Sequence, residues 1–125
     1  MKITRFENIE AWQVARSLAD RIYQVTKTGA FSKDYGLKDQ VCRAAVSTMA
    51  NIAEGFDAGS NAEFARFLAY TQRSTSEVQS ELYVALDQGY ISHQEFAELY
   101  ELLGKVKSKI GAFIKYLNET RRTKH

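Results

Sequence analysis

Residues 40–55 have the sequence QVCRAAVSTMANIAEG, and this stretch decides the fold class and the assembly that we expect. At about 100° per residue, one broad arc of the helix that they form is apolar, as a core-facing helix requires. The opposite arc is also small and apolar, and Arg43 is the only charged residue between Val41 and Ala53. Since one bundle core buries only one side of a helix, we expect a second subunit to cover the other face. The residues of this expected oligomer interface are Cys42, Val46, Ala50 and Ala53.

The length and composition favour a single all-α domain. The chain has 125 residues and no proline, so nothing forces a helix to break. Ser60–Glu63 and Ser92–Glu95 match the capping box that starts a helix, and Asn8 is the expected N-cap of the first helix. We therefore predict an up-down antiparallel four-helix bundle. Its helices are expected at about residues 8–28, 34–57, 60–88 and 92–119, followed by a frayed tail at 120–125.

A row of polar residues follows one edge of the second predicted helix, and an antiparallel third helix adds two more. Such a row is either a hydrogen-bonded seam that fixes how the helices align or a binding site. It contains no histidine and no nucleophile with a base, which favours the seam. Within it we predict a partly buried ion pair between Arg43 and Glu77. The polar seam consists of Gln40, Arg43, Ser47, Asn51, Glu54, Ser74 and Glu77.

The net charge of +2 hides an asymmetry along the chain. Residues 105–125 hold seven Lys and Arg against Glu119 alone, whereas residues 1–104 hold ten against fourteen carboxylates. A basic helix end complements the helix dipole, which explains part of the pattern without a partner. The same charges would bind phosphates independently of sequence, especially if an oligomer repeated them. The candidate nucleic-acid-binding residues are Lys105, Lys109, Lys115, Arg121, Arg122 and Lys124.

Motifs for catalysis, cofactors, metals and membranes are missing from the sequence. There is no P-loop, no Gly-rich dinucleotide turn and no HExxH, and the two histidines stand at a helix start and at the last residue. The single Cys42 lies in the apolar stretch, as a small buried hydrophobe does. No apolar run reaches the roughly 18–20 residues that cross a bilayer, and the N-terminus lacks the apolar core of a signal peptide. We expect a cytoplasmic protein that is not an enzyme and has no cofactor, metal or membrane partner.

Several motifs resemble the small four-helix-bundle family typified by the 23S ribosomal RNA intervening-sequence protein. They are Trp12-Gln13, Tyr35-Gly36-Leu37, Arg43-Ala44-Ala45 and above all Asn51-Ile52-Ala53-Glu54-Gly55, and the likeness continues to Gly89-Tyr90. The resemblance implies an up-down bundle that commonly assembles as a ring of five, without enzymatic activity. The chain is also similar to accessory variability proteins of diversity-generating retroelements, whose basic pentamers are thought to engage nucleic acid and a reverse transcriptase. Thr71 and Arg73 stand where the family usually has Ala and Gly.

Together these features predict a non-catalytic, homo-oligomeric interaction module whose partner is RNA or DNA backbone. The alternative is a purely structural or regulatory scaffold that binds another protein. A pI of about 8.7 fits both hypotheses.

Overall fold

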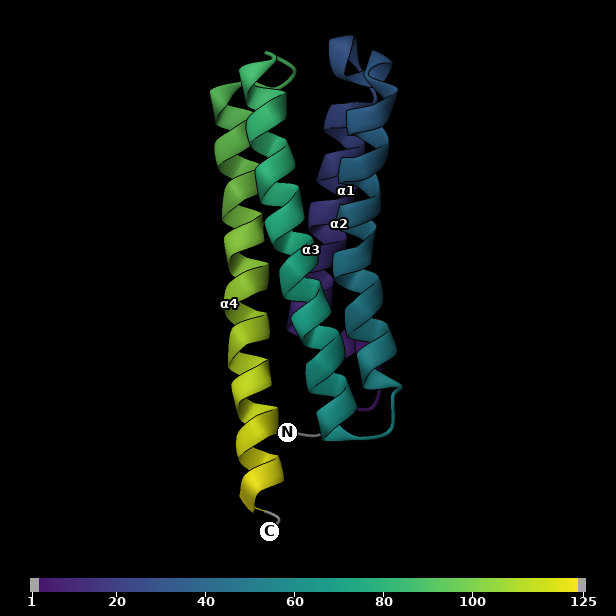
Figure 1. Cartoon of the computed structure of the whole chain (residues 1–125), viewed down its shortest axis with the longest axis vertical. Coiled ribbons are helices and arrows are strands. Elements are labelled where there is room, and N and C mark those ends of the chain that lie inside the picture. Colours follow the sequence, from purple (N-terminus) through teal and green to yellow (C-terminus); the bar gives the residue numbers. More distant parts are fainter. Residues whose placement is uncertain (1–2, 124–125) are drawn as a thin grey trace.

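The computed structural model describes the backbone of residues 3–123 and the side chains of residues 3–120. Over this range the chain forms helices α1 (Glu10–Thr26), α2 (Tyr35–Phe56), α3 (Asn61–Asp87) and α4 (His93–Thr123), with short 3-10 helices η1 (Phe6–Asn8) and η2 (Gly29–Lys33). The long helices run alternately up and down, each packs against the next, and α4 closes the bundle against α1 (Figure 1). The all-α up-down four-helix bundle is confirmed.

Serine caps set the starts of α3 and α4, as the sequence predicts, although the Glu63 carboxylate binds Arg66 and only α4 has the full capping box. The Ser60 hydroxyl accepts a hydrogen bond from the Glu63 amide at 3.1 Å. At α4, the Ser92 hydroxyl accepts from the Glu95 amide at 3.0 Å, while the Glu95 carboxylate accepts from the Ser92 amide at 2.9 Å. Each bond satisfies an amide that the first helical turn leaves free.

The two ends of the chain differ from the expected helix bounds. Asn8 ends η1, and α1 begins at Glu10 after Ile9, whose side chain makes no capping bond. Ile9 is 2% exposed, so burial of an apolar side chain rather than a polar cap fixes this helix start. At the other end, α4 continues to Thr123 and not to the predicted residue 119. Its C-terminal part, yellow in Figure 1, extends past the turn that joins α2 and α3.

A layer of buried threonines divides the core into two apolar clusters. One cluster contains Leu18, Ile22, Val41, Leu82 and Leu103, and the other contains Ile52, Phe64, Leu68 and Ile110. Thr48, Thr71 and Thr75 lie between them, each fully buried. The Thr71 hydroxyl donates across helices to the Thr48 carbonyl at 3.1 Å, and the other two hydroxyls donate within their own helices. All three hydroxyls are therefore satisfied, as buried polar groups must be.

Helices α2 and α3 pack closely at Gly55. A Cβ atom at this position would lie 2.8 Å from Phe67 Cβ and 2.9 Å from Phe64 Cδ1. Glycine is required here because no larger residue fits between the helices without moving them. Within residues 3–123, no helix combines the length and the apolarity that crossing a membrane requires.

We predict that Gly55→Ala lowers the free energy of unfolding by about 1–3 kcal/mol, because the added methyl overpacks the contact with Phe64 and Phe67. Gly104→Ala is the matched control, since a Cβ there meets no atom within 4 Å. It should raise stability by up to about 1 kcal/mol, because alanine favours the helical backbone. Urea denaturation followed by circular dichroism measures both changes. Equal effects at the two glycines would contradict the close approach.

Candidate interaction surfaces

The outer face of α2 carries three of the four residues expected at an oligomer interface. Val46 is 40% exposed, and Ala50 and Ala53 are half-buried. Cys42 is different, because it is only 7% exposed and its Sγ lies 3.5 Å from Thr26 Oγ1 of α1. The expectation that a second subunit covers Cys42 is wrong, since α1 already covers it. The apolar surface of α2 left open to a partner is therefore Val46, Ala50 and Ala53.

The predicted ion pair between Arg43 and Glu77 is also wrong. The Arg43 side chain is 79% exposed, and its Nε lies 2.9 Å from the Asp39 carboxylate one turn earlier on α2. Glu77 is exposed on α3. Pairing along its own helix leaves the guanidinium hydrated, whereas a bond across a seam would require both charges to lose water.

The remaining residues of the polar row do not form a continuous buried seam. Gln40 and Glu54 are exposed, while Ser47, Asn51 and Ser74 are half-buried. The Asn51 amide donates to the Ser47 carbonyl at 2.9 Å and to its hydroxyl at 3.3 Å, so these bonds stay within α2. The row is consequently a mostly solvated face of α2 bordered by polar residues of α3.

Glu81, one turn beyond Glu77 on α3, has the most strongly shifted pKa among the described residues. Burial, together with repulsion by and a hydrogen bond with the neighbouring Glu77, raises the pKa of its carboxyl from the ordinary value of 4.5 to about 7. One carboxyl oxygen of Glu81 is buried without a hydrogen-bond partner. Within the part of the chain that the structure describes, no group of three or more His, Cys, Asp or Glu is arranged to hold a metal ion.

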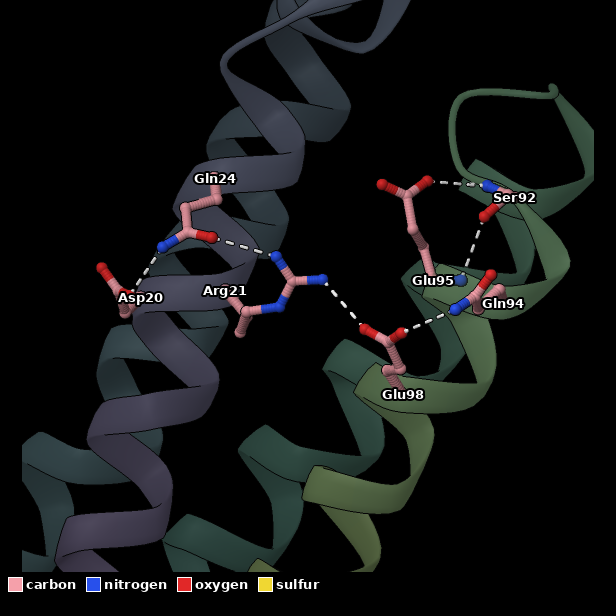
Figure 2. A network of polar contacts seen from close by, with 7 residues as sticks. All are labelled: Asp20, Arg21, Gln24, Ser92, Gln94, Glu95 and Glu98. Atoms are coloured by element: carbon pink, nitrogen blue, oxygen red, sulfur yellow. Dashed lines mark hydrogen bonds and ion pairs between the residues drawn. The ribbon is translucent and has the colours of Figure 1, made fainter.

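Polar side chains join the acidic start of α4 to α1 (Figure 2). Arg21 lies at the centre, with one guanidinium nitrogen 3.1 Å from the Glu98 carboxylate and another 2.9 Å from the Gln24 side-chain oxygen. The Gln24 amide donates in turn to Asp20 at 2.8 Å. Because Glu98 pairs with Arg21 and Glu95 caps α4, part of the charge segregation along this helix serves the fold itself.

The predicted basic residues separate into two groups. Lys109 Nζ lies 2.7 Å from the Glu10 carboxylate of α1, a hydrogen bond that holds the pKa of Glu10 below its ordinary value. Lys105 Nζ lies 3.9 Å from Glu101. Lys115 is exposed and forms no ion pair with any described residue. The side chains of Arg121 and Arg122, and all of Lys124, lie outside the described residues. The open basic surface therefore begins at Lys115, near the end of α4.

An aromatic surface beside Lys115 was not predicted from the sequence. Tyr116 is 58% exposed, the second most exposed of the large hydrophobic residues after Tyr35. It borders two shallow grooves, one of about 330 Å³ with Ile3, Ala112 and Phe113, and one of about 280 Å³ on the side of Phe56 and Ser60. The only sequence signal was Lys115-Tyr116 itself, because exposure depends on which flank of α4 the neighbouring elements leave uncovered.

Comparisons with known proteins agree with this fold. The family described as 23S rRNA-intervening sequence protein matches residues 7–112. A similar crystal structure is that of a protein of unknown function from the S23 ribosomal protein family of Bacteroides thetaiotaomicron VPI-5482, with a TM-score of 0.78 and 21% identity over 84% of this chain and 95% of that chain. That likeness concerns the fold alone. A search of curated proteins finds no match to the chain. The family match ends before Lys115.

We predict that the free energy of unfolding falls as pH rises, because the Glu81 carboxyl loses its proton. The folded protein keeps the Glu81 proton up to about pH 7, whereas the unfolded chain releases it near 4.5, so the free energy of unfolding decreases between these values. The decrease should be roughly 1–2 kcal/mol, below the full linkage value because the side chain is partly solvated. Glu81→Gln should remove it and be more stable than wild type at pH 8.

Urea denaturation at pH 5 and pH 8 tests this linkage, with Glu54→Gln at an exposed carboxylate of α2 as the control. The control should keep the wild-type pH dependence. An unchanged pH dependence in Glu81→Gln would show that another group is responsible.

Proposed function

The chain belongs to the 23S rRNA-intervening sequence protein family, and we propose that it is a cytoplasmic, non-catalytic, homo-oligomeric module that binds nucleic-acid backbone. The observation that carries this proposal is the basic C-terminal part of α4, which extends past the α2–α3 turn (Figure 1). Residues 115–125 hold four Lys and Arg against one carboxylate. Lys105 and Lys109, nearer the middle of α4, already pair with carboxylates.

A basic helix end suits phosphates better than it suits a specific base sequence. Each phosphate that a Lys or Arg neutralises releases counterions, which gives sequence-independent affinity that depends steeply on salt. Lys115 is the described member of this basic surface, and its exposure leaves the ammonium free to reach a phosphate. Arg121, Arg122 and Lys124 add charge beyond it.

Association through α2 would multiply this modest charge. Val46, Ala50 and Ala53 offer a small apolar surface on which another helix can pack closely, and several linked basic ends bind a polyanion more tightly than one. A ring of five is the assembly that the resemblance to the family implies. The second candidate function, a protein-binding scaffold, would use the same α2 face for a different partner.

We predict that Val46→Glu dissociates the oligomer, because an unpaired charge in an apolar interface costs several kcal/mol. Native mass spectrometry or light scattering at micromolar concentration should detect single subunits of the Val46→Glu variant and an assembly of the wild type. Ala97→Glu, at an exposed alanine of α4, is the matched control and should leave the assembly intact. A wild-type protein that is a stable monomer under these conditions would overturn the oligomer.

We predict that replacing Lys115, Arg121, Arg122 and Lys124 with Gln weakens binding to RNA and DNA. Wild-type affinity should fall steeply between roughly 50 and 200 mM salt, and the logarithmic salt slope should shrink by about 0.7–0.9 for each phosphate that the variant no longer neutralises. Fluorescence anisotropy with labelled oligonucleotides measures both quantities, and circular dichroism checks that helicity is retained.

The control for this experiment replaces Lys27 and Lys33, two exposed lysines at the opposite end of the bundle, with Gln. It should bind like wild type. If wild type binds neither RNA nor DNA at low salt, or if the charge variant binds with an unchanged slope, the nucleic-acid function is wrong and the protein scaffold replaces it.

A further inference from the structure

Tyr116 is the outermost member of a series of aromatic side chains that runs from α2 through α3 to α4. Phe56 of α2 lies 6.2 Å from Phe64 of α3, Phe64 lies 5.0 Å from Phe113 of α4, and Phe113 lies 6.2 Å from Tyr116, measured between ring centroids. Phe64 is buried and Phe113 half-buried, whereas more than half of Tyr116 is exposed. The inner rings hold Phe113 in place, and Phe113 in turn supports the tyrosine.

The surroundings of Tyr116 leave room for a flat ligand. Grooves of about 330 and 280 Å³ border this side chain; Ile3 and Phe113 line both, and the larger extends to Ala112 while the smaller extends to Phe56 and Leu117. Their linings are mainly apolar, and the larger approaches the size of small-ligand clefts. A supported tyrosine with space on two sides can present a ring face, and it loses little conformational entropy when it is covered.

The positive charge beside the aromatic surface indicates the chemical class of the ligand. Lys115 precedes Tyr116 directly and has no carboxylate partner among the described residues, and the chain beyond is basic. A flat apolar group next to a phosphate is the chemistry of a nucleotide with an unpaired base. Single-strand-binding proteins combine a basic surface with aromatic side chains on which bases stack, because every base has a π-face.

We infer that Tyr116, supported by Phe113 and next to Lys115, is a stacking site for an unpaired nucleobase. This inference rests on the proposed function and gives it a selectivity: the protein prefers single-stranded RNA or DNA to a duplex. In a duplex the bases are stacked on one another, so only the phosphates are available, and Tyr116 then contributes nothing.

The test compares a labelled single-stranded oligonucleotide, its blunt duplex and a strand of equal length made of abasic sites, by fluorescence anisotropy at one low salt concentration. Wild type should bind the single strand more tightly than the duplex or the abasic strand. Tyr116→Ala should weaken binding to the single strand by about 5- to 150-fold, the range that the loss of one base–aromatic stack gives. Its affinity for the duplex and the abasic strand should change less than about twofold, since phosphate contacts remain.

Two further variants separate stacking from structure. Tyr116→Trp keeps an aromatic face and should retain the preference for single strands. Tyr35→Ala removes an even more exposed tyrosine, at the start of α2 and far from the basic end, and should bind all three probes like wild type. An equal weakening by Tyr116→Ala on all three probes, or no weakening on any, would overturn the stacking site while leaving phosphate binding in place. Absence of wild-type binding to every probe would overturn the proposed function and the stacking site together.

Discussion

The contact between Gly55 of α2 and two phenylalanines of α3 is the constraint on which the arrangement of the bundle depends. Phe64 and Phe67 occupy the space that any other side chain at position 55 would need. The Thr71 hydroxyl donates to the Thr48 carbonyl. Thr48 lies seven residues before Gly55 on α2 and Thr71 lies seven residues after Phe64 on α3, so this bond is about two turns from the glycine contact. Because the two contacts require the same antiparallel alignment, they fix the register of α2 against α3. Helix α1 packs against α2, and α4 packs against α3, so both are placed on the pair of helices that these contacts align.

Local signals predicted the helices well. The caps at Ser60 and Ser92 depend only on residues three apart: both serines cap their helices as expected, and the reciprocal glutamate bond forms at Ser92. Asn8 failed as a cap because tertiary packing decided that helix start, through the burial of Ile9. The helical wheel of α2 misplaced Cys42 for a related reason. A wheel separates core from solvent, but α1 and α3 flank α2 and cover a wider arc than the core stripe alone.

Side-chain partners were much harder to predict than helices. Arg43 pairs with Asp39 on its own helix, where it stays hydrated, and not with Glu77 of α3. Lys109 pairs with Glu10, ninety-nine residues away in the chain, which no local pattern indicates. The open basic surface is therefore smaller than the charge count implies. The exposure of Tyr116 was equally invisible, since a helical pattern does not show which flank of α4 its neighbours leave uncovered.

The length of α4 also makes the two ends of the bundle different in charge. Its 31 residues correspond to about 46 Å of helix, and its basic end emerges at one end of the bundle only, while its acidic start is tied to α1 at the other. In a cyclic assembly whose symmetry axis runs along α4, every subunit presents that end on the same side. Such a ring has two chemically different sides, and a polyanion would be drawn to one of them and repelled by the other. The orientation in which the ring meets its ligand would then be set before the first contact forms.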